Sequence, residues 1–383
     1  MIDIIKIINE GKVETPAHVI DLNQVYNNLE NINAIRKETG IKVFFTLKGF
    51  SNDIILKRFI NNLDGVSSSG LFESKLGREL NMKISTFSNA YTDKNIQEIC
   101  KNSDYVIFNS INQYNNYKEY AKKENCSIGI RINPEYTELP NEFGANTCKK
   151  DSHLGIKKDS MPDISEFYKN NIEGIHLHTM CEQHADALER TIDNLIQNYD
   201  EYLKNIKWLN LGGGQLLGDK KYNVKKAIES IKKLQEKYNI DIILEPCEGI
   251  MFNSGYYVTR VVDLIKNNIN IAVVDGSAIC HIPDSVYKGW TKDMIGEVED
   301  EKEGYKYKIT GCSCYAGDTF GEYYLNKKLE IGDVIVFEDT ASYTMVKNNI
   351  FNGISFPNLY VIDINKNLEK VKNYGYDIFK MII

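Results

Sequence analysis

The feature that most constrains the fold is a regular alternation of two sequence patterns between about residues 40 and 250. Short apolar runs rich in β-branched residues alternate with longer segments, such as residues 186–203 and 224–238, in which apolar residues recur every three or four positions. The eight runs are residues 42–47, 65–69, 84–88, 105–110, 127–134, 172–178, 208–214 and 241–246. This alternation predicts parallel βαβ units. Eight units favour a closed (β/α)8 TIM barrel over the alternative, an open doubly wound sheet.

The pattern changes after residue 255. Short runs separated by turns, without long helices between them, predict an antiparallel β domain. These runs are residues 256–265, 271–275, 305–310, 333–337 and 359–362. A further short run at residues 18–21 is expected to be an N-terminal strand of the same domain. We therefore predict a barrel domain of residues 22–255 and a β domain made of residues 1–21 and 256–383.

Charge and composition restrict the partners. The 383 residues include 46 Lys and Arg against 53 Asp and Glu, a formal net charge of −7, which argues against nucleic acid and anionic membranes because both attract basic surfaces. No apolar stretch approaches the roughly 18 residues of a spanning helix, and the N-terminal segment lacks the features of a signal peptide. Eight scattered cysteines without metal-knuckle spacing indicate reduced thiols and a cytoplasmic protein.

In a parallel barrel, chemistry is concentrated at the C-terminal ends of the strands. Lys48 follows the run VFFTL, where a buried lysine can acquire a lowered pKa and react with carbonyl groups, or can extend out to solvent. The glycine triplet Gly212, Gly213 and Gly214 follows WLNL and either lets a phosphate approach the backbone or forms a tight turn. Glu245 lies between apolar residues and a proline and needs a partner, either a protonated ring nitrogen or a structural arginine.

The histidines and cysteines allow other chemistry. His176 and His178 alternate along one predicted strand and so face the same side. A His-x-His pair can begin the site of a metal-dependent hydrolase, but no other histidine ends a predicted barrel strand, so a metal is not expected. A single histidine can instead stack on a flat cofactor. Cys312 and Cys314 have no second pair nearby, which favours a reactive or buried thiol over a metal clip.

A series of short motifs runs in order along almost the whole chain: TPAHVIDL, TLKGF, SSSGLFESK, VIFNS, RINPE, SHLG, GIHLHTMCE, WLNLGGG, LEPCE, VVDGSAICHIPD, GCSCYAGD and YTMVKNNIFNGI. Together they resemble the fold III pyridoxal-phosphate-dependent decarboxylases, which have an alanine-racemase-like (β/α)8 barrel and a C-terminal antiparallel β-barrel domain. Within that family they are most similar to the carboxynorspermidine/carboxyspermidine decarboxylases. The resemblance implies a lyase that uses pyridoxal 5'-phosphate to convert carboxynorspermidine or carboxyspermidine to norspermidine or spermidine, in polyamine biosynthesis.

The resemblance also implies roles for individual residues. Lys48 would carry the cofactor covalently, His178 would stack on its ring, and Glu245 would keep the ring nitrogen protonated. The glycine triplet would hold the phosphate together with the hydroxyl of Tyr343. Cys314, supplied by the second subunit of a homodimer, would protonate the carbanion left by loss of CO₂. The residues expected on the substrate side are Arg131, Glu182, His281, Asp284 and Asp318.

Three positions depart from the family pattern. Cys247 replaces the usual glycine after Glu-Pro, Gln215 stands where a histidine is expected after the glycine triplet, and His153 replaces the usual arginine before Leu-Gly. These departures concern residues expected near the cofactor phosphate and the substrate, and not the lysine that would carry the cofactor. The alternatives are a fold III decarboxylase of another amino acid, such as diaminopimelate, ornithine or a biosynthetic intermediate, a non-catalytic cofactor-binding homeostasis protein without a β domain, and the metal-dependent hydrolase.

Overall fold

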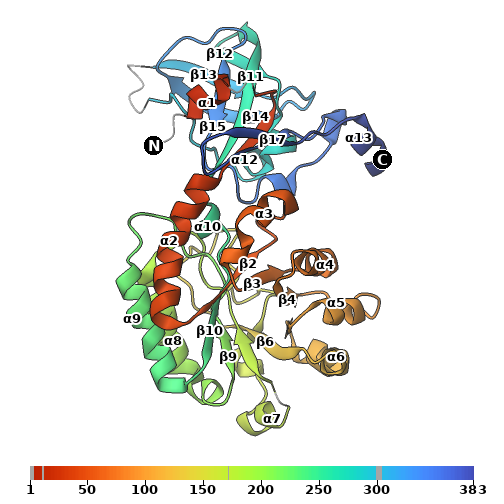
Figure 1. The fold of residues 1–383 in the computed structure, drawn as a ribbon, viewed down its shortest axis with the longest axis vertical. Helices are drawn as coiled ribbons and strands as arrows, with labels where there is room; N and C mark the ends of the chain where they lie inside the picture. Colours follow the sequence, from red (N-terminus) through yellow and green to blue (C-terminus); the bar gives the residue numbers. More distant parts are fainter. Residues whose placement is uncertain (1–3, 11–12, 171, 299–303) are drawn as a thin grey trace. The chain divides into compact units, whose positions relative to one another are not determined.

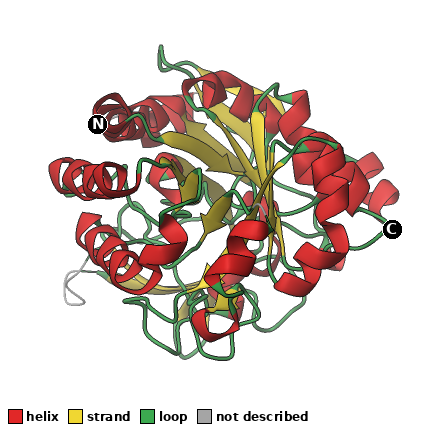
Figure 2. Cartoon of the chain, turned by 90° about the horizontal axis from the view of Figure 1, so that it is seen from below, coloured by secondary structure: helices red, strands yellow, loops and turns green. Residues whose placement is uncertain are grey.

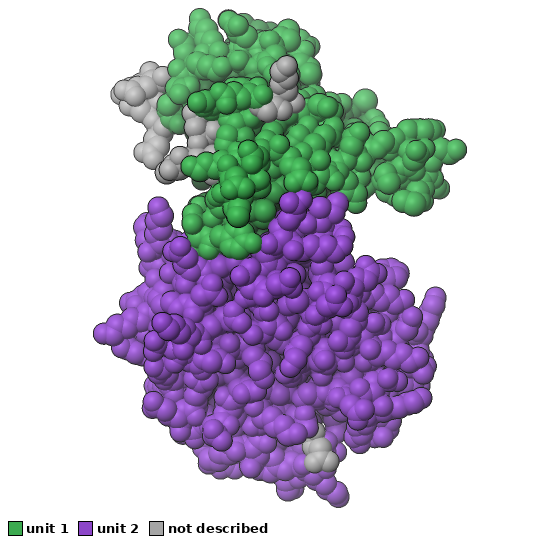
Figure 3. All heavy atoms as spheres, in the orientation of Figure 1, with its two compact units in different colours: residues 1–27, 251–383 green, residues 28–250 purple. Residues whose placement is uncertain are grey.

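The computed structural model of the chain describes residues 4–10, 13–170, 172–298 and 304–383. The chain divides into two compact units, which are residues 1–27 with 251–383 (unit 1) and residues 28–250 (unit 2), as Figure 3 shows. The division runs through α2 (Leu22–Thr39) and α10 (Glu248–Met251), a few residues from the boundaries that we predicted after residues 21 and 255. Parts of the predicted β domain, residues 1–3, 11–12 and 299–303, lie outside the described residues.

Unit 2 is a closed parallel barrel with helices on its outside (Figures 1 and 2). Its strands are β2 (Lys42–Thr46), β3 (Gly65–Ser68), β4 (Lys83–Ser88), β5 (Tyr105–Phe108), β6 (Ser127–Asn133), β8 (Gly174–His176), β9 (Trp208–Asn210) and β10 (Asp241–Leu244). Each strand pairs in parallel with the next, and β10 pairs with β2, so the sheet closes. The barrel is confirmed and the open sheet is excluded. The short β7 (Ile156–Lys157) extends the end of β6.

The helices of unit 2 follow the strands as the sequence periodicity predicts. They are α3 (Asp53–Phe59), α4 (Leu71–Glu79), α5 (Ile96–Asn102), α6 (Ile111–Lys123), α7 (Ile164–Lys169), α8 (Ala185–Leu203) and α9 (Val224–Tyr238), with 3-10 turns η1 (Ile60–Asn62) and η2 (Lys158–Ser160). Helix α9 shows how their ends are defined. The Asn223 side chain accepts the N–H of Lys226 at its start, and Asn239 ends it in the left-handed conformation, as expected for capping residues.

One large side chain occupies the barrel interior near the N-terminal ends of the strands. Trp208 on β9 packs with Phe44 and Ile243. Gly129 on β6 and Gly174 on β8 leave room for its indole ring, because a Cβ atom at these glycines would lie 2.3 and 2.0 Å from ring carbons. An apolar layer therefore closes the interior on this side.

The next inward positions of the same three strands are polar. The register pairs Arg131 with His176 and His176 with Asn210, and all three side chains are buried. Residues two apart on a strand share a face, so these side chains lie on the same inner face as the Trp208 layer. We call them the polar row. It lies toward the C-terminal ends of the strands, where barrel chemistry is expected.

Unit 1 is a mixed β structure. Its strands are β1 (Ala17–Asp21), β11 (Gly255–Lys266), β12 (Asn270–Val274), β13 (Tyr305–Thr310), β14 (Thr319–Leu325), β15 (Val334–Phe337), β16 (Asn358–Ile362) and β17 (Leu368–Lys372). Most pairs are antiparallel, as predicted, but β1 runs parallel to β16 and β12 parallel to β13. Strand β1 pairs with β11 and β16, and so belongs to this sheet.

The rest of unit 1 consists of short helices and an aromatic core. The helices are α1 (Ile4–Glu10), α11 (Ala278–His281), α12 (Pro283–Tyr287) and α13 (Tyr376–Ile382), with 3-10 turns η3 (Met345–Lys347) and η4 (Phe351–Gly353). Stacked rings of Tyr257, Phe320 and Phe337 form the centre of the core. None of the helices in the described ranges combines the length and apolar composition needed to cross a bilayer.

Candidate active site

Lys48 lies in a tight turn directly after β2, where the Gly49 N–H donates to the Thr46 carbonyl (3.3 Å). The side chain keeps solvent-accessible surface, but the protein surrounds its amino group. Burial therefore lowers the pKa of Lys48, and the charge of Arg131 lowers it further, partly offset by Glu245. A lowered pKa leaves more of the amine neutral at neutral pH, which is the form that attacks a carbonyl.

Glu245 follows β10 and is held at both its backbone and its side chain. Its N–H donates to the Gly212 carbonyl (2.8 Å), and its own carbonyl accepts the Thr46 hydroxyl (2.6 Å). The carboxylate accepts the Asn210 amide (2.7 Å), and its other oxygen lies 3.5 Å from His176 Nε2. Burial would raise the pKa of Glu245, but the contacts with His176 and Asn210 outweigh it, and the pKa lies below its ordinary value. The buried carboxylate is therefore ionised, and among the described residues its side-chain contacts include an asparagine and a histidine but no arginine.

The glycine triplet passes close to the chain that follows β8. Gly212 and Gly214 have φ values of +68° and +91°, a region that L side chains rarely adopt. A Cβ atom on Gly212 would lie 2.5 Å from the Leu177 carbonyl oxygen, and one on Gly214 would lie 2.1 Å from that of Met180. Both the backbone angle and the available space therefore require glycine at these two positions.

Two N–H groups of the triplet are already engaged by side chains. The Gly212 N–H donates to Asn210 Oδ1 (2.9 Å), and the Gly213 N–H donates to His178 Nδ1 (3.2 Å). The sequence suggested either a phosphate cradle or a tight turn. The structure shows that the triplet links β9 to the His178 ring, so these two N–H groups would contact a phosphate only after giving up their present partners.

The Gly213 contact fixes the state of His178. Because Nδ1 accepts a hydrogen bond, the proton of the neutral ring lies on Nε2. Burial lowers the pKa of His178 well below its ordinary value, and the nearby charges of Lys48 and Arg131 lower it further. The Thr147 hydroxyl donates to the His178 carbonyl (2.5 Å) and holds the backbone. His178 is therefore a neutral, oriented ring beside Lys48.

Arg131 extends from β6 into the barrel interior. Its guanidinium lies 4.5 Å from the centre of the Phe87 ring, and Nε has no hydrogen-bond partner among the described residues. Burial lowers the pKa of Arg131 to about 10, so the side chain remains a cation at neutral pH. It supplies positive charge beside Lys48.

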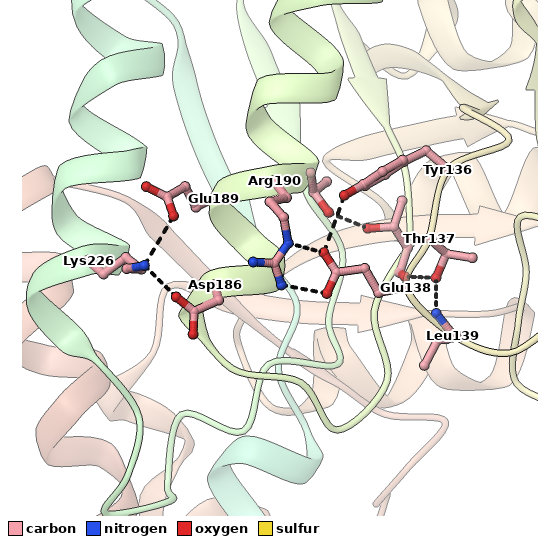
Figure 4. A network of polar contacts seen from close by, with 10 residues as sticks. Tyr136, Thr137, Glu138, Leu139, Asp186, Glu189, Arg190 and Lys226 are labelled. Atoms are coloured by element: carbon pink, nitrogen blue, oxygen red, sulfur yellow. Dashed lines mark hydrogen bonds and ion pairs between the residues drawn. The ribbon is translucent and has the colours of Figure 1, made fainter.

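The loop after β6 is fixed to the outer helices (Figure 4). Arg190 on α8 binds the Glu138 carboxylate with two donors, one of them the 2.7 Å bond from Nη2 to Oε2, and the Thr137 hydroxyl donates to the Thr179 carbonyl (2.6 Å). The ion pairs that join α8 to α9 in this view are those of Lys226 with Asp186 and Glu189. This network holds the loop whose later residue contacts the His178 carbonyl.

Glu182 lies in the loop after β8, in a left-handed conformation (φ +51°). Its carboxylate is exposed and lies near the Cys181 thiol and the Glu248 carboxylate, because possible ligand atoms of these three residues fall within 4.8 Å of one another. Among the described residues, these three form the one cluster of acidic, cysteine or histidine side chains that is spaced closely enough to hold a metal ion. Neither His176 nor His178 belongs to it. It places negative charge on the unit that carries Lys48.

In unit 1, Asp318 organises the loop that carries Cys314. The buried Asp318 carboxylate accepts the Ser277 hydroxyl (3.0 Å) and the Ser313 N–H (3.1 Å). Cys314 is an exposed free thiol, and its N–H donates to Asn352 Oδ1 (3.1 Å). The structure therefore gives Asp318 a supporting position behind an accessible cysteine.

His281 is fully buried in unit 1. Its Nδ1 lies 2.7 Å from the Tyr257 hydroxyl, and its Nε2 lies 3.0 Å from the Ser355 carbonyl oxygen. Burial lowers the pKa of His281 to about 4. Both ring nitrogens are thus used inside the unit. This is the geometry of a structural residue, and contact with a substrate would require breaking these bonds.

Asp284 and Tyr343 are joined through one lysine. Lys347 Nζ lies 2.6 Å from the Asp284 carboxylate and 5.3 Å from the centre of the Tyr343 ring. Lys288 Nζ also contacts the Asp284 carboxylate, at 3.0 Å. Burial would raise the pKa of Asp284, but the two lysines outweigh it, and the pKa is lowered. Asp284 is therefore ionised and paired, and Tyr343, at φ +56°, is packed beside its partner.

Comparison with known proteins identifies the family. The family model described as pyridoxal-dependent decarboxylase, C-terminal sheet domain, matches residues 18–341. The chain belongs to the pyridoxal-dependent decarboxylases. A carboxynorspermidine/carboxyspermidine decarboxylase from Campylobacter jejuni is 35% identical, with 97% of this chain and 98% of that protein covered. A carboxyaminopropylagmatine decarboxylase from Synechocystis is 29% identical, with 97% and 95% covered.

A solved structure agrees with this assignment. The carboxynorspermidine decarboxylase from Campylobacter jejuni, complexed with norspermidine, superposes with a TM-score of 0.87 at 32% identity, covering 97% of this decarboxylase and 100% of that chain. The diaminopimelate decarboxylase from Helicobacter pylori shares the fold, with a TM-score of 0.81 at 17% identity and 98% of each chain covered. Membership of this family confirms a pyridoxal-phosphate-dependent lyase and decides against the metal-dependent hydrolase. The presence of unit 1 argues against the single-domain homeostasis protein.

The residues of unit 2 fit the cofactor of the family, pyridoxal 5'-phosphate. They supply an amine of lowered pKa, an ionised buried carboxylate and a neutral histidine ring. They also supply a glycine segment in which side chains would clash with backbone atoms. The amine, carboxylate and histidine match the carbonyl, ring nitrogen and ring face of that molecule, whereas a phosphate at the glycine segment would have to displace Asn210 and His178 from two of its N–H groups.

Sequence reasoning missed Asn210, which contacts both Glu245 and Gly212. A signal was present, because Asn210 lies two residues after Trp208 and so shares its inward face. The three departures from the family pattern have distinct surroundings. Cys247 and Gln215 are buried, whereas His153 is exposed and offers its carbonyl to Asn109 Nδ2 (2.8 Å).

Proposed function

We propose that this decarboxylase acts on carboxynorspermidine or carboxyspermidine and releases CO₂ with norspermidine or spermidine. The observation that carries the proposal is the near-complete match, at 35% identity, to a relative of that name, together with a similar structure that holds norspermidine. The carboxylates of Glu182 and Glu248 suit a substrate with several amino groups. Glu248 is close enough to Lys48 to oppose the lowering of its pKa, so negative charge lies near the reacting amine.

The proposed roles follow the geometry of unit 2. When bound, pyridoxal phosphate supplies the electron sink for loss of the α-carboxylate. Lys48 Nζ would hold the cofactor at its carbonyl carbon and would release it to the amine of the substrate. Glu245 would keep the ring nitrogen protonated, and the neutral His178 ring would pack against the face of the cofactor. Arg131 keeps positive potential beside Lys48, and the phosphate would bind at the glycine triplet in place of the Asn210 and His178 contacts.

We further propose a homodimer in which Cys314 of one subunit donates a proton at the site of its partner. Support comes from the family resemblance and from the exposed position of this thiol on a loop that Asp318 holds in place. The proposed partner surface belongs to unit 1 of the second copy. The eight cysteines, all free in the structure, fit a reducing compartment, and we propose a cytoplasmic enzyme.

Mixing two inactive variants tests the shared site. Lys48→Ala and Cys314→Ala should each be nearly inactive alone. After subunit exchange, half of the dimers would be mixed and each would hold one intact site, so activity should return to roughly a quarter of the wild-type value. The Cys314→Ser variant, measured alone, controls for disturbance of the loop that carries Cys314. Demonstrated exchange without recovered activity would show that Cys314 does not act across the dimer.

A substrate panel tests the specificity. The purified holoenzyme should release CO₂ from carboxynorspermidine or carboxyspermidine with a kcat/KM at least about tenfold above that for diaminopimelate, ornithine and carboxyaminopropylagmatine. A second candidate, diaminopimelate, is favoured by relatives such as the Methanocaldococcus jannaschii diaminopimelate decarboxylase, 24% identical over 91% of this chain and 86% of that protein. A higher kcat/KM for any of the other substrates would overturn the proposed specificity.

A further inference from the structure

The polar row contains one histidine that none of the proposed steps uses. His176 lies between Arg131 and Asn210 in the register of β6, β8 and β9. Its side chain is 3% exposed, and its ring centre lies 5.4 Å from that of Phe87. It is therefore sealed inside the barrel, beneath the strand ends at which a substrate would bind.

The polar contact that His176 makes is with Glu245. Nε2 lies 3.5 Å from Glu245 Oε2, while the Asn210 amide donates to Oε1 at 2.7 Å. The opposite nitrogen, Nδ1, has no partner within the described part of the chain. At 3.5 Å the contact is at the outer limit of a hydrogen bond, so it acts mainly through charge and dipole. The carboxylate is thus approached from two sides by N–H donors.

The protonation state of His176 follows from its neighbours. The charged or titratable groups that influence it are Glu245, Arg131 and Lys48, and it in turn influences His178. Burial lowers the pKa of His176, Arg131 and Lys48 lower it further, and Glu245 raises it, with a net lowering. A neutral ring that faces a carboxylate carries its proton on the nearer nitrogen, Nε2, because two facing acceptors would repel.

We propose that His176 is a positioning residue that holds Glu245 through Nε2–H and makes that carboxylate a weaker base, so that the proton stays on the ring nitrogen of the bound cofactor. The inference rests on the proposed role of Glu245. A carboxylate that receives N–H donors holds its charge more readily. Without the His176 donor, Glu245 would become more basic and would draw the proton away from the ring nitrogen.

The test reads the ring nitrogen directly. Holoenzyme is reconstituted with cofactor labelled with ¹⁵N at that nitrogen, and its chemical shift is recorded for wild type and variants, together with kcat and KM. His176→Phe should move the signal toward the unprotonated value and lower kcat roughly tenfold or more, with KM nearly unchanged. His176→Gln, which retains an N–H donor, should recover part of both effects. His176→Met replaces Phe if the larger ring prevents folding.

Two controls separate the possible failures. Ser85→Ala removes another buried polar group, one with no hydrogen-bond partner among the described residues. It lies on β4 of the same barrel, and the change should leave the signal and kcat unchanged. Glu245→Gln should give the unprotonated signal. If Glu245→Gln does so while the donor-free His176 variant, Phe or Met, keeps the wild-type signal, the role of His176 is refuted. If Glu245→Gln itself keeps the protonated signal, the proposed role of Glu245 fails instead.

Discussion

Gly174→Ala offers a direct test of how the barrel interior supports the polar row. The Cβ of an alanine at this position would lie 2.0, 2.1 and 2.4 Å from three carbons of the Trp208 indole. The ring cannot easily withdraw, because its Nε1–H donates to Ser127 Oγ (2.8 Å) and its edge packs on Tyr105, with ring centres 5.4 Å apart. Gly174 is followed two residues later by His176 on the same face of β8.

The magnitude follows from the overlap. Ordinary carbon contacts lie at about 3.5–4.0 Å, so the indole or β8 has to shift by more than about 1 Å in a close-packed interior. Overpacking of this kind costs about 1–3 kcal/mol, and the three simultaneous overlaps put Gly174→Ala at the upper end. For a unit of about 200 residues, about 3 kcal/mol corresponds to a fall in Tm of roughly 6–12 °C.

The assay is thermal unfolding of the holoenzyme followed by far-ultraviolet circular dichroism, since the indole itself is one of the changed groups. Gly144→Ala is the matched control, because a Cβ atom there meets nothing within 4 Å, and its Tm should stay within about 2 °C. In a Trp208→Leu background, which is itself destabilised, the added penalty of Gly174→Ala should fall below about 1 kcal/mol. An unchanged Tm for Gly174→Ala, or an equal penalty in both backgrounds, would refute the reasoning.

Three further predictions concern the site and unit 1. Lys48→Ala should lose both the visible absorption band of the bound cofactor and decarboxylation while keeping its circular dichroism; either property at the wild-type level would contradict the role of Lys48. Arg190→Lys cannot make two hydrogen bonds to the Glu138 carboxylate. It should speed hydrogen exchange in residues 134–150 and change the free energy of unfolding by less than about 1 kcal/mol. Unchanged exchange would show that Arg190 does not hold this loop. The pKa of His281 is about 4 in the folded chain, whereas an ordinary histidine has a pKa of 6.5. As the pH falls, the unfolded chain therefore binds the proton first, so the free energy of unfolding should decrease between about pH 6.5 and pH 4. The full loss should be about 3 kcal/mol. His281→Gln should flatten the dependence of Tm on pH in that window, and an unaltered slope would show that His281 does not set it.

Much of the fold could be predicted because apolar runs at strand spacing are unambiguous in a parallel barrel, whose strands are buried on both faces. Strands β14 and β17 were not predicted. Glycine and glutamate interrupt TFGEYYL, and LEKVK, which pairs only with β16 in the described sheet, has little buried surface, so neither carries the apolar signal of a core strand. The parallel pairing of β1 with β16 also depends on contacts between distant segments, which local periodicity does not encode.

The candidate site was predictable where a residue type is unusual for its place, as with the lysine at the end of β2 and the glutamate after β10. The direction of a polar side chain was harder to predict. His281 ends the short helix α11, and its side chain turns into the core of unit 1, where Tyr257 and Ser355 contact its two ring nitrogens. Likewise, the sequence shows that the glycine triplet is special but not that Asn210 and His178 occupy two of its N–H groups.

The polar row explains how one interior lowers the pKa of an amine and still keeps a carboxylate charged. Burial penalises every charge, so by itself it would lower the pKa of Lys48 and raise that of Glu245, leaving both groups uncharged. Lys48 follows this rule, and Arg131 reinforces it by adding positive potential. Glu245 departs from it because donors from Asn210 and His176 reach its two oxygens. These donors lie on β8 and β9. Two residues earlier on the same strands, Gly174 packs against Trp208. The charge of Glu245 therefore depends on how closely that apolar layer fits, and a disturbance at Gly174 should weaken the role proposed for Glu245 as well as the stability of the barrel.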